Sequence, residues 1–171
     1  MNLEDLAIQE QELLWKIESV TGLMEEKSAQ LQQLSVYSNY VKIYQAYAEI
    51  ISRDDQNLEA IKRAVFLSWY QFAEPACFSG LLNLPEEITQ FICEILERKI
   101  KNNELDLELK WMLPFYNAIF ELPFTLYPQL TNLQSFLSTA NSYLWQREIK
   151  RNNLSLRGQM GEYWLTIENE E

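Results

Sequence analysis

The fold class is decided by residues 57–74, which read NLEAIKRAVFLSWYQFAE. Apolar side chains recur at helical spacing on one face, and further apolar residues widen that face to most of the circumference: Leu58, Ile61, Val65, Phe66, Leu67, Trp69, Tyr70, Phe72 and Ala73. A helix that is apolar nearly all round is buried. It should end at Glu74, because the residue before Pro75 is pushed out of the α region. The pattern therefore predicts a central helix, with Trp69 and Phe72 in the core.

The composition favours helices throughout the chain. Leucine occurs 26 times and valine four times, and there are only four glycines and five prolines. Leucine loses little rotamer freedom in a helix, whereas β-branched residues favour strands. We therefore expect an all-α fold, and the apolar periodicity along the chain predicts a compact bundle of about six to eight helices. The 171 residues fit a single domain, residues 1–171, on the scale of about 100–200 residues per domain.

Residues 3–35 carry a leucine-rich seam at alternating steps of three and four. Its members are Leu3, Leu6, Leu13, Ile17, Val20, Met24, Leu31 and Leu34. Glu10 and Lys27 break the seam, and Gly22 interrupts it, because glycine costs about 1 kcal/mol relative to alanine inside a helix. One long helix and two helices with a break near Gly22 both fit. Residues 1–35 are either a helical arm through which the chain forms a homo-oligomer, or the first part of the bundle.

Four further helices are predicted, over residues 36–52, 85–100, 104–122 and 128–151. The helix over residues 85–100 has the cleanest apolar stripe in the chain. Pro114 lies inside the helix over residues 104–122 and should kink it or split it in two.

The C-terminal tail, residues 152–171, differs from the rest of the chain. It holds Gly158 and Gly161, two of the four glycines, and Tyr163, Leu165 and Ile167 then alternate along it. Its large apolar groups are too many for a disordered segment. We expect an irregular tail that docks back on the bundle, with a short extended piece as one form of it.

The charge and the absence of histidine exclude several functions. The chain has 25 acidic and 14 basic side chains, for a net charge of −11, and no histidine. Nucleic-acid binding needs a surplus of lysine and arginine. Catalytic triads and imidazole metal sites need histidine, and phosphate cradles need glycine-rich motifs that the sequence lacks. We predict no enzymatic activity, no cofactor and no nucleic-acid partner.

The sequence shows no sign of export or of membrane insertion. The first residues carry acids where a signal peptide carries positive charge, and no stretch reaches the ~18 uncharged apolar residues of a membrane span. Cys77 and Cys93 each lie alone in an apolar setting. We expect a cytoplasmic protein with two buried, reduced thiols, and a pair joined on oxidation is the alternative.

A tyrosine stripe is the sharpest feature of the helix over residues 36–52. Tyr37, Tyr40, Tyr44 and Tyr47 recur at steps of three, four and three, so they share one face. Tyrosine combines a large contact area with a polar tip and is enriched at binding surfaces. The stripe is therefore the candidate partner- or ligand-binding site. The alternative is that the rings pack at the edge of the core with their hydroxyls in water.

Carboxylates are the only candidate metal ligands. Glu87, Glu94 and Glu97 share a face of one helix, as Mg²⁺ ligands do in helical enzymes that hydrolyse nucleotides. Glu94 also lies four residues before Arg98, and Glu97 four before Lys101, which is the spacing of surface ion pairs. A solvated acidic surface explains these residues without a metal.

A basic cluster follows the helix over residues 128–151. Its members are Arg147, Lys150, Arg151 and Arg157. Cations at the end of a helix complement the helix dipole, which explains the cluster without an anion or RNA site.

Taken together, the sequence predicts a non-enzymatic protein-interaction module, an adaptor or an immunity-type inhibitor. Residues 1–60 hold 11 acidic and four basic side chains, a net charge of −7. Charge complementarity then favours a partner protein with a basic surface, bound near the N-terminal helices. A carrier of a small apolar ligand, held between helices, is the alternative. A Mg²⁺-dependent nucleotide hydrolase is the third hypothesis.

Overall fold

The computed structural model describes residues 2–139 and 154–169. This part of the chain is helical, with no strand, which confirms the all-α prediction. The α-helices are α1 (Leu3–Ser19), α2 (Met24–Gln33), α3 (Val36–Arg53), α4 (Leu58–Ala73), α5 (Ala76–Ser79), α6 (Glu86–Lys101), α7 (Leu107–Ile119), α8 (Thr131–Thr139) and α9 (Gly158–Asn169), with 3₁₀ turns η1 (Phe124–Leu126) and η2 (Leu154–Leu156). None of these helices is long and apolar enough to cross a membrane.

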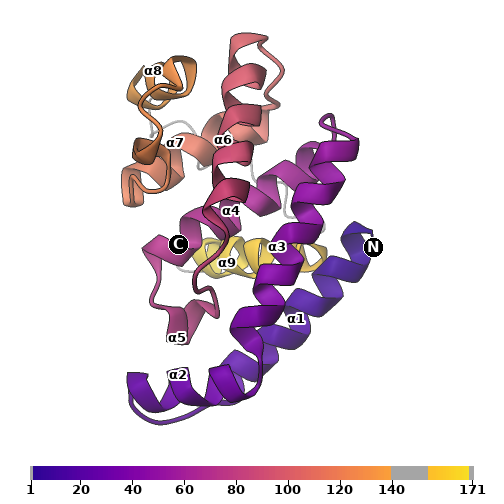
Figure 1. Ribbon diagram of the computed structural model, residues 1–171, viewed down its shortest axis with the longest axis vertical. Helices are drawn as coiled ribbons and strands as arrows, with labels where there is room; N and C mark the ends of the chain where they lie inside the picture. Colours follow the sequence, from indigo (N-terminus) through magenta and orange to yellow (C-terminus); the bar gives the residue numbers. More distant parts are fainter. Residues whose placement is uncertain (1, 140–153, 170–171) are drawn as a thin grey trace.

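Helix α4 is the centre of the bundle, as residues 57–74 predict. It packs against α3, α5, α6, α7 and α9. In Figure 1, α6, α7 and α8 gather at one end of the molecule and α2 and α5 lie at the other, with α4 between them and α3 running lengthwise beside it. Asn57 caps the start of α4 by accepting a hydrogen bond from the Ala60 amide (3.1 Å), and the helix ends before Glu74, next to Pro75.

The N-terminal seam folds as two helices, α1 and α2. Gly22 has a φ of +110°, a conformation that residues with a Cβ rarely adopt, and it lies in the break between them. Just after it, the Glu26 carboxylate accepts a hydrogen bond from the Leu23 amide (2.9 Å) and so caps α2. Helix α1 packs against α3 and α9, so it lies within the bundle.

The C-terminal tail docks on α1, but it does so as a helix and not as the irregular segment that the sequence predicted. Helix α9 buries Met160 and Trp164, four residues apart, against the core. Both glycines are required by close packing: a Cβ at Gly158 would strike the Glu10 carboxylate, and one at Gly161 the Leu154 carbonyl. Glycine is a poor helix former, so a prediction from local propensity misses this helix. The two glycines are present because the packing of α9 requires them.

Helix α7 is shorter than the helix predicted over residues 104–122. Helix α7 continues through Pro114 and is not split. Helix α8 is described from Thr131 to Thr139, and the rest of the predicted helix over residues 128–151 lies outside the described residues.

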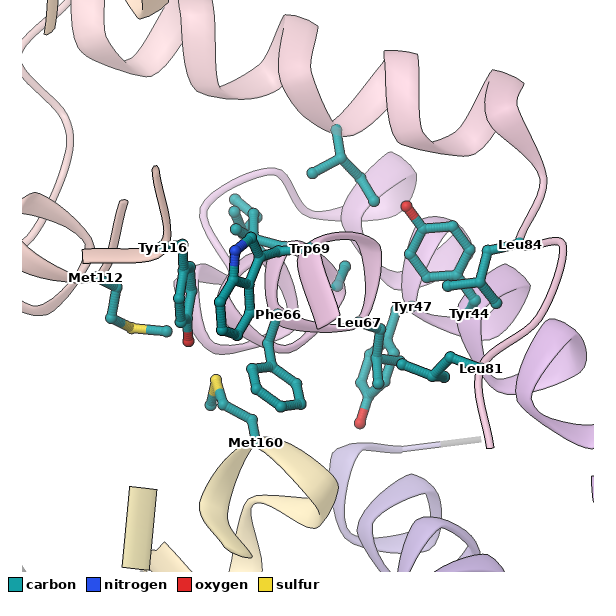
Figure 2. Packing of buried hydrophobic residues seen from close by; sticks show 14 of the residues in the cluster. Tyr44, Tyr47, Phe66, Leu67, Trp69, Leu81, Leu84, Met112, Tyr116 and Met160 are labelled. Atoms are coloured by element: carbon teal, nitrogen blue, oxygen red, sulfur yellow. The ribbon is translucent and has the colours of Figure 1, made fainter. Parts of the chain in front are cut away.

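An aromatic cluster joins α4, α7 and α9 in the core. The rings of Trp69 and Tyr116 stack with centroids 4.4 Å apart, and the Trp164 indole donates a hydrogen bond to the Tyr116 hydroxyl (3.2 Å). Figure 2 shows Trp69 beside Tyr116, with Phe66 facing Met160. Stacked and tilted aromatic pairs contribute about 0.5–1.5 kcal/mol beyond their buried area, so this cluster fixes α9 to the bundle.

Both cysteines are free and buried, as predicted. Burial, followed by the charge of Glu94, raises the pKa of Cys93 to about 12, so its thiol stays protonated at neutral pH.

Candidate binding groove

The tyrosine stripe lies in the core and not on the surface. Tyr37 is 6% exposed, and Tyr40, Tyr44 and Tyr47 are 0% exposed. Tyr44 shares a hydrogen bond with the Thr89 hydroxyl (3.0 Å) on α6. The hydroxyls are buried too, unlike those of rings that pack at the edge of a core. A partner therefore cannot reach the stripe while the helices are packed in this way.

The three candidate metal ligands do not converge. Glu97 accepts hydrogen bonds from the backbone amides of Asn132 (3.1 Å) and Leu133 (2.7 Å), and so caps α8. Glu94 accepts a hydrogen bond from Gln90 (2.8 Å), and Glu87 is exposed. Within residues 2–139 and 154–169, no three acidic or cysteine side chains come together in a way that could hold a metal ion.

The predicted ion pair between Glu94 and Arg98 does not form. Arg98 pairs instead with Asp55 (2.5 Å), in the turn between α3 and α4. The packing of α6 against α3 and α4 brings that turn within reach, so a tertiary contact replaces the one inside the helix.

Replacing Glu97 with alanine tests its role as the cap of α8. Loss of a helix cap typically lowers the free energy of unfolding by about 1–2 kcal/mol. Desolvation opposes ionisation here, but hydrogen bonds from Asn132 and Leu133 outweigh it and lower the pKa of Glu97. The carboxylate therefore stabilises the fold at neutral pH, and this contribution disappears as the pH falls through that lowered pKa. Urea unfolding at pH 7 measures the loss.

Glu94→Ala is the matched control, because Glu94 lies on the same helix and accepts a hydrogen bond from Gln90 of that helix, not from the start of α8. It should change stability by less than about 0.5 kcal/mol. Equal losses for the two variants would show that Glu97 does not act as a cap.

A surface groove of about 770 Å³ lies where the C-terminal end of α4, the 81–84 loop, the start of α6 and η1 meet. Its apolar lining comes from Phe72, Pro75, Ala76, Leu81, Leu82, Leu84, Pro123 and Leu126. Its polar lining comes from Gln71, Glu74, Asn83, Glu86, Thr89 and Tyr127. The groove is open to solvent and has the mixed lining of a binding site.

Local sequence shapes the walls of this groove. Pro75 stops α4, and Asn83 turns the loop with a φ of +52°, which asparagine tolerates better than most residues. The Gln71 side chain accepts a hydrogen bond from the Leu84 amide (3.3 Å) and so ties the loop to α4. Pro85 then precedes α6, and Glu86 lies in its first turn, where a carboxylate complements the helix dipole.

Three apolar side chains line the groove while remaining exposed. They are Phe72 (38%), Leu82 (39%) and Leu126 (49%). The prediction that Phe72 lies in the core is therefore wrong. Helix α4 emerges from the bundle over its last turn, and Phe72 lies at that end. Beneath these residues Leu81 and Leu84 belong to the core, and Figure 2 shows Leu84 beside Tyr44.

Outside the groove, Glu10 of α1 is a buried acid. It is 1% exposed and accepts hydrogen bonds from the Tyr47 hydroxyl (2.5 Å) and from the backbone amide of Gln159 (2.7 Å). Burial, opposed by these two hydrogen bonds and by the charge of Arg63, raises the pKa of Glu10 to about 7. Glu10, which breaks the leucine seam, thus caps the first turn of α9, where that helix meets α1.

Charged side chains reinforce the docking of the same tail. Arg157 donates two hydrogen bonds to the Glu59 carboxylate (2.8 and 2.6 Å) and also pairs with Glu108. Lys62 pairs with the other carboxylate oxygen of Glu108 (2.5 Å). Arg157 therefore joins the tail to α4 and α7. Arg147, Lys150 and Arg151, the other members of the predicted basic cluster, lie outside the described residues.

Comparisons with protein families, with curated proteins and with solved structures find no match for this chain. The function of the groove is therefore inferred from its shape and its lining residues. Sequence reasoning missed it because four separate segments form it. The available signal was the cluster of apolar and turn-forming residues between Phe72 and Pro85, which interrupts the helices.

Proposed function

We propose that this chain is a non-enzymatic interaction module that holds a segment of a partner protein in the groove between α4, α6 and η1. The observation that carries the proposal is the exposure of Phe72, Leu82 and Leu126 around one open groove. Apolar side chains gathered in a polar surround mark interaction sites on protein surfaces. An inserted side chain would contact these three residues above a floor already packed by the core.

A small apolar ligand is the second candidate. The volume of about 770 Å³ falls within the range of about 300–1,000 Å³ found for ligand pockets. Such pockets bury most of the surface of their ligand, whereas this groove is open and leaves its apolar side chains in water. The open shape supports a segment of a larger partner over an enclosed ligand.

A nucleotide hydrolase has less support. Its Mg²⁺ would need acidic ligands from facing elements. In the described part of the chain the Glu97 carboxylate accepts hydrogen bonds as the cap of α8. No group of three acidic or cysteine side chains among these residues could hold a metal ion.

The proposal predicts that peptides selected from a random displayed library bind the groove. Replacing Leu82 and Leu126 together with alanine should weaken their binding about tenfold or more, because truncating two apolar contacts at a binding site typically costs over 1 kcal/mol. Isothermal titration of the selected peptides against each variant measures the effect.

The matched control is the double variant Leu34→Ala/Leu107→Ala, which truncates two leucines that are exposed outside the groove. It should leave the affinity unchanged. The proposal is contradicted if both double variants weaken binding equally, or if no peptide binds the chain.

A further inference from the structure

The groove carries negative charge that nothing in the described chain neutralises. Glu74 and Glu86 both line it, and no lysine or arginine of residues 2–139 and 154–169 does. Neither carboxylate forms an ion pair with any residue among 2–139 and 154–169. By contrast Glu59 and Glu108, on α4 and α7, are each held by two cations. The groove, at the C-terminal end of α4, therefore differs from the N-terminal end of that helix, where carboxylates pair with cations.

A second observation at the same place is the hydroxyl of Tyr127. Tyr127 lines the groove and is 5% exposed, and its hydroxyl is buried with no hydrogen-bond partner in the described structure. Thr89, which also lines the groove, bonds with Tyr44 (3.0 Å) and not with Tyr127. A buried polar group without a partner costs about 1–3 kcal/mol, and such groups are rare in folded proteins.

These two observations favour the same kind of occupant. An anion would be repelled by Glu74 and Glu86. A neutral apolar group would remove water from the two carboxylates and offer them no hydrogen bond or opposite charge in return. A cation on an aliphatic stem would pair with the carboxylates while its stem lies along Leu82 and Leu126. Its N–H groups could donate to the Tyr127 hydroxyl, which accepts as well as donates.

We infer that the segment bound in the groove carries a lysine or arginine beside its apolar anchor, and that Glu74, Glu86 and Tyr127 recognise this cation. The inference rests on the proposed function and specifies the chemistry of the partner. The matching surface of the partner is basic and apolar together. The net charge of −11 on the whole chain would accelerate encounter with such a partner.

The test uses two probes that differ only in charge, hexylammonium chloride and 1-hexanol. Each is titrated into the ¹⁵N-labelled full chain at low salt, and amide shifts are followed by NMR. Probes of this size bind in about the millimolar range. Hexylammonium should bind about five- to tenfold more tightly than hexanol, since each exposed carboxylate contributes up to about a fivefold gain. The shifts should include the amides of Thr89, Leu126 and Tyr127.

Three variants assign that preference to particular side chains. Glu74→Gln/Glu86→Gln should remove the advantage of hexylammonium, and Tyr127→Phe should weaken hexylammonium about two- to tenfold with little effect on hexanol. Glu87→Gln is the matched control, because Glu87 is exposed beside Glu86 but does not line the groove. It should retain the full preference.

The outcomes separate this inference from the proposed function. If hexanol binds as tightly as hexylammonium, if neither binds the groove, or if Glu87→Gln matches Glu74→Gln/Glu86→Gln, the cation inference is overturned. The proposed function still stands in each case, provided that the selected peptides bind and depend on Leu82 and Leu126. If the selected peptides bind but lack lysine and arginine, the cation inference is contradicted. The proposed function as an interaction module still stands in that case.

Discussion

Replacing Trp164 with alanine should lower the free energy of unfolding by about 3–5 kcal/mol, the typical cost of removing a large aromatic side chain from a core. Trp164 is 1% exposed, packs edge to face on Trp111 (centroids 4.8 Å apart) and donates to the Tyr116 hydroxyl (3.2 Å). The substitution leaves a cavity and an unpaired hydroxyl at the point where α9 meets α7. Urea unfolding of the full chain measures the loss.

Thr166→Ala is the control on the same helix, because Thr166 is exposed and its hydroxyl donates to the Glu162 carbonyl within that helix (3.0 Å). It should change stability by less than about 0.5 kcal/mol. Trp164→Phe should fall between the two, since it keeps most of the apolar volume but loses the indole N–H. A Trp164→Ala protein as stable as Thr166→Ala would show that α9 does not complete the core.

The second large effect depends on pH and comes from Glu10. The pKa of Glu10 in the folded chain is about 7, against an ordinary value of 4.5, and burial is the main cause. Between these values the folded state holds a proton that the unfolded state has released, so stability falls as the pH rises. At about 1.4 kcal/mol per pH unit, Glu10 should reduce the free energy of unfolding by about 3 kcal/mol between pH 4.5 and pH 7.

Glu10→Gln isolates this contribution. The glutamine amide imitates the protonated acid: its oxygen can accept from the Gln159 amide while its NH₂ group donates to the Tyr47 hydroxyl. Other groups titrate equally in both proteins, so the difference between their unfolding free energies should shift in favour of the variant as the pH rises from 5 to 8. A difference that stays constant over this range would mean that Glu10 does not titrate with a raised pKa.

Most of the helices can be predicted from the sequence, because the apolar periodicity and the turn residues of each segment agree with the helix that it forms. The apolar circumference of residues 57–74 places α4 at the centre, and Gly22 marks the break between α1 and α2. The prediction of an irregular tail is wrong for a physical reason. Gly158 and Gly161 lower helix propensity, but they are needed where the backbone of α9 approaches Glu10 and Leu154.

The candidate site was far less predictable. The tyrosine stripe is compatible with a binding surface and with a core face, since tyrosine suits both, and only packing against α4 and α6 decides between them. The groove forms because Phe72, Leu82 and Leu126, which belong to three separate segments, lie close together in the fold. The periodicity within a single segment cannot predict this arrangement. Glu10 was visible as a defect in the leucine seam, but its partners Tyr47 and Gln159 are far away in sequence.

The location of a bound peptide tests the central proposal most directly. A peptide enriched by selection is titrated into the ¹⁵N-labelled chain, and the shifted amides are mapped on the fold. The proposed function predicts shifts around Thr89, Leu126 and Tyr127. Shifts confined to the outer face of α1, where Ile8 and Trp15 are also exposed, would place binding on a different surface and contradict the groove as the site.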